Sequence, residues 1–145
     1  NTIPDVIDID VDIRTVPGTT KADVEQHLRD AIGDLYDHVE VSELQSSDPT
    51  ACAYGDGNPL WDAVTKHTQI AYPGAKLIPG LITGGTDARF YRERGSVAYG
   101  AGLYSGKMDF ATFGARFHGN DERIDLESLG LAAEYFYGIT KDLLT

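Results

Sequence analysis

The stretch Ile7-Asp8-Ile9-Asp10-Val11-Asp12-Ile13-Arg14 alternates apolar and polar residues without exception. Strict alternation is typical of a β-strand that has one buried and one solvated face. The pattern ends near Pro17-Gly18, and Thr20 with Asp23 then resembles a capping box that begins a helix. A second strand is predicted over residues 36–44. The order strand–helix–strand predicts a mixed α and β unit in this part of the chain.

A polar stretch over residues 45–58 connects this unit to a second one, because it holds Ser, Asp, Pro, Gly and Asn. Beyond it, caps, glycines and apolar spacing predict alternating helices and strands. In chain order we expect a helix from Asn58-Pro59 to Pro73, a strand over 76–83, a helix over 84–94, a strand over 97–103 and a helix that begins at Asp125. The predicted fold class is therefore α/β or α+β.

The apolar residues of the last predicted helix indicate which of its faces is buried. Those that follow helical spacing, and that we expect to point inward, are Leu129, Ala132, Phe136, Ile139 and Leu143.

The composition excludes several classes of partner. The 145 residues include 12 Lys+Arg and 23 Asp+Glu, which gives a formal net charge of −11. Phosphates and anionic lipids would be repelled, so we expect no nucleic-acid partner and no membrane partner. Residues 1–13 lack the pattern of a signal peptide, and the single cysteine, Cys52, excludes an intrachain disulfide. These features predict a cytoplasmic protein.

The segment Gly84-Gly85-Thr86-Asp87-Ala88-Arg89 leads into a predicted helix. Backbone N–H groups at such a position attract anions, and the guanidinium of Arg89 could bind a carboxylate or a phosphate. A tight turn with a threonine cap explains the same residues. The two interpretations, anion binding and structural turn, stay open on the pattern alone.

The segment Phe117-His118-Gly119-Asn120-Asp121-Glu122 places one imidazole and two carboxylates in a loop before the last helix. Imidazole is a common ligand of zinc-like metals, but such sites take at least three protein ligands. Read in isolation, His118 is therefore interpreted as a surface histidine. The other three, His27, His38 and His67, are interpreted as solvated, and no nucleophilic triad can be assembled.

These motifs together resemble M20-type metallopeptidases. Asn1-Thr2-Ile3-Pro4-Asp5, followed by Arg14 and Pro17-Gly18, resembles the middle of the family's dimerisation (lid) domain. The segment over 84–90 resembles its substrate-side glycine–threonine loop, and the segment over 117–122 resembles its C-terminal metal-ligand motif. The three occur in the family's order and span essentially the whole chain.

The resemblance implies a partial ferredoxin-like lid unit at 1–47 and the closing α/β segment of a catalytic domain at 48–145. It implies a homodimeric amidohydrolase or peptidase with two zinc or cobalt ions per full-length subunit, acting on an N-acyl amino acid or a small peptide. His118 would bind metal, with Glu122 orienting it. The substrate would contact Asn1, Arg14, Gly85, Thr86 and Arg89.

The resemblance also implies what this chain lacks. The family's general base and its other metal ligands lie in a His-x-Asp motif, a bridging aspartate and a Glu-Glu pair, all upstream of the matching region. We therefore expect the chain of 145 residues to be a C-terminal piece that is inactive alone. The alternatives are a non-catalytic dimerisation module and an anionic-metabolite-binding module on the same scaffold. An upstream reading frame with the His-x-Asp motif would favour the enzyme.

Overall fold

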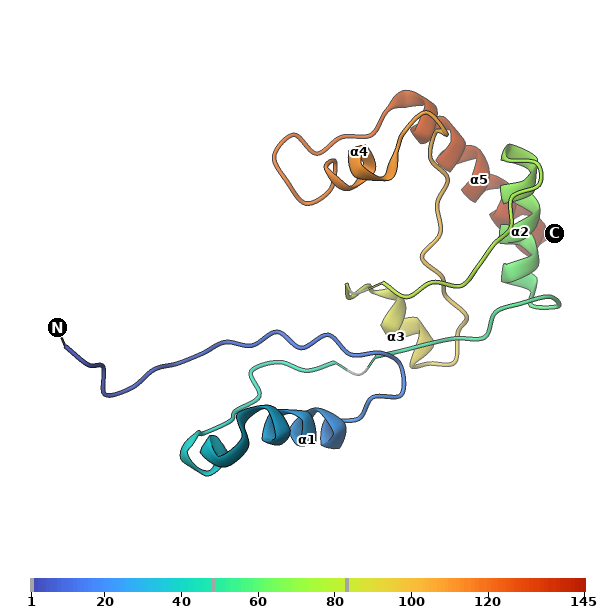
Figure 1. Cartoon of the computed structure of the whole chain (residues 1–145). Helices are drawn as coiled ribbons and strands as arrows, with labels where there is room; N and C mark the ends of the chain where they lie inside the picture. The colour runs from blue at the N-terminus through green and yellow to red at the C-terminus, as the bar shows by residue number, and fades with distance from the viewer. Residues whose placement is uncertain (1, 48, 83) are drawn as a thin grey trace.

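The computed structural model describes residues 2–47, 49–82 and 84–145 (Figure 1). The regular elements in these ranges are helices: α1 (Lys21–Ile32), the 3₁₀ helix η1 (Gly33–His38), α2 (Pro59–Ala71), α3 (Ala88–Arg92), α4 (Phe110–Gly114) and α5 (Leu126–Leu144). Helix α2 packs against α5, and α1 packs against η1. None of the helices in the described ranges has both the length and the apolar character needed to cross a bilayer.

The N-terminal part begins with a long extended segment that precedes α1 (Figure 1). Residues 7–14 have no paired strand among the described residues, and Ile7, Ile9 and Val11 are exposed. The alternation of this segment is compatible with a strand whose apolar face is buried by packing against another element. The ferredoxin-like pairing of the lid unit therefore stays a prediction.

Helix α1 begins where the sequence predicts. Thr20 Oγ1 accepts a hydrogen bond from the Asp23 N–H at 3.3 Å, and the Asp23 carboxylate accepts one from the Thr20 N–H at 2.8 Å. These two bonds make the predicted capping box. Beyond the helix, the predicted strand over 36–44 is wrong for Tyr36–His38, which belongs to η1. The Arg29 guanidinium lies 4.3 Å from the Tyr36 ring centroid and holds this turn against α1.

The hydrophobic core lies between α2 and α5, which run side by side (Figure 1). Its buried side chains are Ala63, Val64, Leu103, Tyr135 and Ile139. Helix α2 starts at the predicted cap, because Asn58 Oδ1 accepts hydrogen bonds from the N–H groups of Leu60 and Trp61 at 3.1 and 3.2 Å. This cap positions α2 so that its buried residues meet α5.

The buried face of α5 differs from the predicted one. Ile139 is buried as expected, but Ser128 and Tyr135 are buried as well. Three residues predicted to point inward are largely exposed: Leu129 (50%), Phe136 (51%) and Leu143 (42%). Helical spacing identifies an apolar stripe, but the position of α2 decides which side of α5 is covered, and that position is a tertiary property.

His67 joins α2 to α5, although the sequence predicts it as solvated. Its Nε2 lies 2.9 Å from Asp142 Oδ2, and Lys66 Nζ lies 2.6 Å from the same oxygen. The ring also rests on Gly138, where an added Cβ would lie only 2.2 Å from Cε1 of His67. Glycine at this position of α5 therefore allows the close approach of the imidazole.

Residues 97–103, predicted as a buried strand, run without a partner strand in the described ranges. They are attached to the connector by hydrogen bonds from the Tyr99 hydroxyl to the Ala53 carbonyl at 2.6 Å and from Cys52 Sγ to the Ala98 carbonyl at 3.3 Å. Arg92 of α3 donates to the same Ala98 carbonyl at 2.6 Å. The segment leads directly into the core at Leu103 and so towards the candidate site.

Candidate functional site

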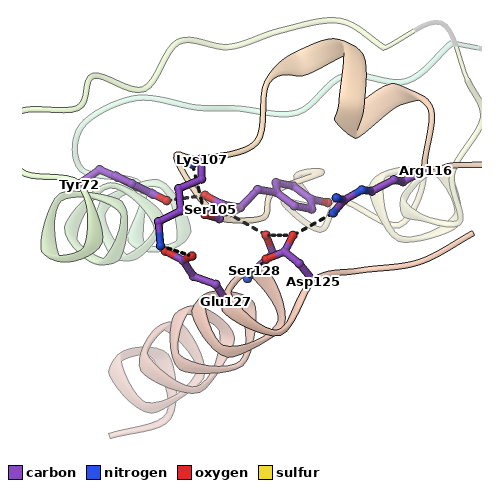
Figure 2. Close-up of polar contacts among 8 residues, drawn as sticks. Tyr72, Ser105, Lys107, Arg116, Asp125, Glu127 and Ser128 are labelled. Atoms are coloured by element: carbon purple, nitrogen blue, oxygen red, sulfur yellow. Dashed lines mark hydrogen bonds and ion pairs between the residues drawn. The ribbon is translucent and has the colours of Figure 1, made fainter.

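The loop that carries His118 is closed at its base by an ion pair. Arg116 Nη1 lies 3.1 Å from Asp125 Oδ2 (Figure 2). Asp125 is the predicted N-cap of α5, and its carboxylate accepts hydrogen bonds from the N–H and the hydroxyl of Ser128, both at 2.8 Å. Both ends of the loop over 117–124 are therefore attached to the start of the longest helix.

Ser128 connects this helix start to the segment before α4. Its side chain is fully buried, and its Oγ accepts a hydrogen bond from the Ser105 N–H at 2.9 Å (Figure 2). Lys107 Nζ pairs with Glu127 Oε2 at 2.9 Å, and the hydroxyl of Tyr72, which directly follows α2, donates to the Tyr104 carbonyl. Ser105 and Ser128 are the buried members of this network, whereas Lys107 and Glu127 are exposed, and hydrogen-bonded polar groups that are buried fix their geometry strongly. This network positions the chain on both sides of α4.

The charges of the network follow from its hydrogen bonds. The bonds from the Ser128 N–H and hydroxyl hold the pKa of Asp125 below its usual value, and the Arg116 charge acts in the same direction. The hydrogen bond from Lys107 likewise lowers the pKa of Glu127, and the same bond raises the pKa of Lys107. Asp125 is therefore ionised at neutral pH, which is the state that caps α5 and pairs with Arg116.

His118 lies in a locally strained backbone. Its φ is 52°, and that of Asp121 is 65°. Among the described residues these are the two non-glycine positions with positive φ, and both belong to this loop. Such positions are disfavoured for residues with a Cβ and concentrate at functional sites. The imidazole is exposed, its centroid lies 6.3 Å from that of Phe117, and the structure shows no hydrogen bond between it and Glu122 in the described part of the chain.

The described residues contain no group of three or more His, Cys, Asp or Glu side chains that could hold a metal ion. His118 has an accessible ring but no companion ligands within these ranges. The described residues therefore do not by themselves fit a complete metal centre.

The predicted substrate residues lie on separate segments. Arg14 donates to the Asp12 carboxylate at 2.7 Å in the extended N-terminal segment. Arg89 belongs to α3, where its guanidinium lies 4.6 Å from the Phe90 ring centroid, while Gly85 and Thr86 are exposed just before this helix. Asn1 lies outside the described residues. The described structure shows no contact that joins Arg14, Arg89 and His118.

A pocket of about 280 Å³ lies beside the His118 loop, and sequence reasoning did not identify it. Its lining residues come from α4, the segment before it and the loop after it: Tyr104, Met108, Phe113, Arg116, Phe117, Glu122, Arg123 and Ile124. The sequence feature that could have indicated this pocket is the spacing of Phe113 and Phe117. Side chains four residues apart lie on one face of a helical turn.

Residues 3–142 match the sequence model of peptidase family M20/M25/M40. Because the match covers nearly the whole chain, the chain belongs to this family, as its three motifs predict. It is similar to the N-fatty-acyl-amino acid synthase/hydrolase PM20D1 of Xenopus tropicalis, at 27% identity over 137 residues. The alignment covers 94% of this chain and 26% of that relative, so the chain spans about a quarter of its length. No solved structure matches the chain.

Proposed function

We propose that this chain is the C-terminal part of a metal-dependent amidohydrolase that cleaves the amide bond of an N-acyl amino acid or a small peptide. The observation that carries the proposal is the match to a peptidase family over residues 3–142. The similarity to a protein named as an N-fatty-acyl-amino acid synthase/hydrolase supports the N-acyl amino acid as the substrate class. Two zinc or cobalt ions per full-length subunit belong to the proposal.

In this proposal His118 is a metal ligand. Two features of the loop support this role. The Arg116–Asp125 pair fixes the base of the loop, and His118 has a positive φ, a conformation that is uncommon outside glycine and concentrates at functional sites. The other ligands and the general base are assigned to parts of the longer protein that this chain does not contain, since the described residues do not assemble a ligand group.

The cationic and glycine-rich residues are assigned to substrate binding. Arg14 would bind the carboxylate of the substrate, and Gly85, Thr86 and Arg89 would line the same pocket. Asn1 is assigned to this pocket as well. For Arg14 this requires the guanidinium to turn from its present contacts, which include the exposed pair with Asp12, towards the substrate.

The division into a lid part at 1–47 and a catalytic part at 48–145 is supported by the packing, because α1 contacts η1 while α2 contacts α5. The net charge of −11 supports a protein without nucleic-acid or membrane partners, and we assign it to the cytoplasm. A homodimer formed through the lid is part of the same proposal. The exposed apolar residues of the segment over 7–13 support an interface there.

The test uses the longer protein in which this chain occurs, with His118→Ala compared to His27→Ala. His27 is an exposed histidine of α1, so its variant controls for the loss of any imidazole. We expect elemental analysis to show less bound metal in His118→Ala alone, and its hydrolysis of an N-acyl amino acid to fall by about 100-fold or more. Unchanged metal content and turnover would refute the metal role. Absence of any hydrolysis in the unmodified protein would favour the non-catalytic binding or dimerisation module.

A further inference from the structure

We propose that the peptide bond between Asp56 and Gly57 is a site of spontaneous isoaspartate formation, and that the Asp62 carboxylate controls its rate by holding the Gly57 N–H. The reaction needs no enzyme and no bound group, so this inference is independent of the proposed function. The chain contains one Asp-Gly pair, at these two positions. A glycine that follows an aspartate leaves the attacking nitrogen without steric hindrance, because glycine has no Cβ.

The reaction at such a pair is a balanced rearrangement through a cyclic imide. With its carboxyl group protonated, Asp56 is attacked at Cγ by the backbone nitrogen of Gly57. The N–Cγ bond forms, the Cγ–OH bond breaks, and the hydroxyl leaves with the proton of the nitrogen as water. Water then adds to one of the two carbonyl groups of the ring. Cleavage of the N–Cγ bond restores aspartate, whereas cleavage of the bond to the backbone carbonyl of residue 56 gives isoaspartate.

The two residues occupy the centre of a tight turn that is open to solvent. The Asn58 N–H donates to the Gly55 carbonyl at 3.2 Å, which closes the turn around Asp56 and Gly57. The φ of Gly57 is 86°, as the third residue of a type II turn requires. Both central residues are exposed, and a Cβ added at Gly57 would meet no atom within 4 Å. Water therefore reaches this peptide bond, and nothing packs against Gly57 where a side chain would lie.

Asp62 of α2 holds the nitrogen that would attack. The Gly57 N–H donates to Oδ1 and Oδ2 of Asp62, both at 3.2 Å. Cyclisation removes the proton of this N–H and turns the nitrogen towards Cγ of Asp56, so both bonds to Asp62 must break first. Asp62 is itself fixed, because it lies in the first turn of α2 and its N–H donates to the carbonyl of the N-cap Asn58 at 2.9 Å. The Asp62 carboxylate therefore slows the reaction.

Isoaspartate at position 56 would change the start of α2. The main chain then runs through the side-chain carbons of this residue and gains one carbon atom. Asn58 follows two positions later, and its Oδ1 accepts the capping hydrogen bonds from Leu60 and Trp61. A displaced cap leaves these N–H groups without their acceptor. We therefore expect the rearranged chain to be less stable than the original one.

The first test incubates the chain of 145 residues at neutral pH and physiological temperature and follows isoaspartate over time. Incubation in H₂¹⁸O labels each ring opening with solvent oxygen, and peptide mapping with an isoaspartyl methyltransferase locates the product. We expect isoaspartate to accumulate faster at position 56 than at any other aspartate. Asp56→Glu, whose longer side chain cannot form the five-membered ring, should form none there.

The role of Asp62 is tested with Asp62→Ala, matched by Asp142→Ala. Asp142 pairs with Lys66 and His67 further along α2, so its variant weakens the attachment of the same helix without touching the turn. We expect Asp62→Ala to form isoaspartate about five-fold faster, the effect of losing one hydrogen bond, and Asp142→Ala to keep the rate of the parent chain. Asp62→Asn keeps one acceptor oxygen and should lie between the two. Circular dichroism checks that each variant keeps its helices.

Each part of the proposal has an outcome that would overturn it. No isoaspartate at position 56, or as much at this position in Asp56→Glu, would overturn the site. Equal rates in Asp62→Ala and Asp142→Ala, or a slower reaction in Asp62→Ala, would overturn control by Asp62. Thermal unfolding after incubation should show a midpoint about 3 °C lower for the isoaspartate form than for incubated Asp56→Glu. Equal midpoints would overturn the effect on the start of α2.

Discussion

Arg116 and Asp125 lie on opposite sides of the loop that carries His118, and their side chains meet at 3.1 Å. The same Asp125 carboxylate caps α5 through Ser128. One side chain thus stabilises the helix and holds the loop base, which couples the position of the candidate ligand to the longest helix of the fold.

This coupling can be tested with Asp125→Ala, which removes the cap and the ion pair together. We expect the free energy of unfolding to fall by about 1–2 kcal/mol, the usual effect of losing an N-cap. Urea denaturation measures it. Asp125→Asn, which keeps a capping oxygen but loses the charge, should show a smaller loss. Equal stabilities of Asp125→Ala and the parent chain would show that the cap is not used.

Two glycines of α5 offer a matched pair for the packing of His67. At Gly138 an added Cβ meets the His67 ring at 2.2 Å, whereas at Gly130 it meets no atom within 4 Å. We expect Gly138→Ala to destabilise the chain by about 1–3 kcal/mol, because the ring must leave its bond to Asp142. Gly130→Ala should stabilise it by up to about 1 kcal/mol through helix propensity. Thermal unfolding measures the stability of the two variants. A stability change of the same sign in both would contradict the described contact between His67 and α5.

The buried face of α5 makes a prediction of its own. Ile139→Ala removes a core side chain and should cost about 2–4 kcal/mol of unfolding free energy. Leu129→Ala removes a half-exposed one and should cost about 0.5 kcal/mol or less. Urea denaturation of the isolated chain compares them. A larger loss for Leu129→Ala than for Ile139→Ala would indicate that Leu129 lies on the buried face of α5, as helical spacing alone predicts.

Stability should fall in acid through the paired carboxylates. Hydrogen bonds from Lys66 and then from His67 hold the pKa of Asp142 below its usual value, and those from Ser128 do so for Asp125. A carboxyl group with a lowered pKa in the folded state adds stability that is present above its unfolded pKa of about 3.9 and is lost as the pH falls through the lower folded value. Urea midpoints measured from neutral to acidic pH should therefore decrease below about pH 4. Asp142→Asn should flatten this decrease, and an unchanged slope would exclude the Asp142 contribution.

Arg14 and His118 are assigned different roles, which their variants should separate in the longer protein. Arg14→Ala should lower kcat/KM for an N-acyl amino acid by about 10- to 100-fold, as expected for the loss of a charged hydrogen bond. Its metal content should stay near that of the unmodified protein, in contrast to His118→Ala. Loss of metal in Arg14→Ala would contradict the assignment of this residue to the substrate.

The features that the sequence predicts well are local. Thr20, Asn58 and Asp125 all cap helices at the expected positions, because a cap depends on a side chain and the N–H groups within three residues of it. The family, too, could be predicted from short motifs around residues such as Arg89 and His118, and the match over residues 3–142 confirms it.

The features that the sequence misses depend on distant segments. His67 contacts Asp142, which lies 75 positions further along the chain, so no local pattern distinguishes it from a solvated histidine. The exposed side of α5 was misassigned at Phe136 for the same reason, since the position of α2 is not encoded in the spacing within α5. Within the site His118 was identified, whereas the Arg116 contact and the pocket required the loop geometry.

The exposed segment over residues 7–13 bears on how the chain behaves in concentrated solution. A second copy of the chain can pair with this segment, because its apolar residues Ile7, Ile9 and Val11 are exposed. Pairing of this kind nucleates β-aggregates. Asp8, Asp10 and Asp12 alternate with them and act as gatekeepers, because stacking identical strands in register would bring like charges together. Salt screens this repulsion, so colloidal stability should decrease as ionic strength increases. The same alternation that predicts a strand thus also protects the chain for as long as that strand is uncovered.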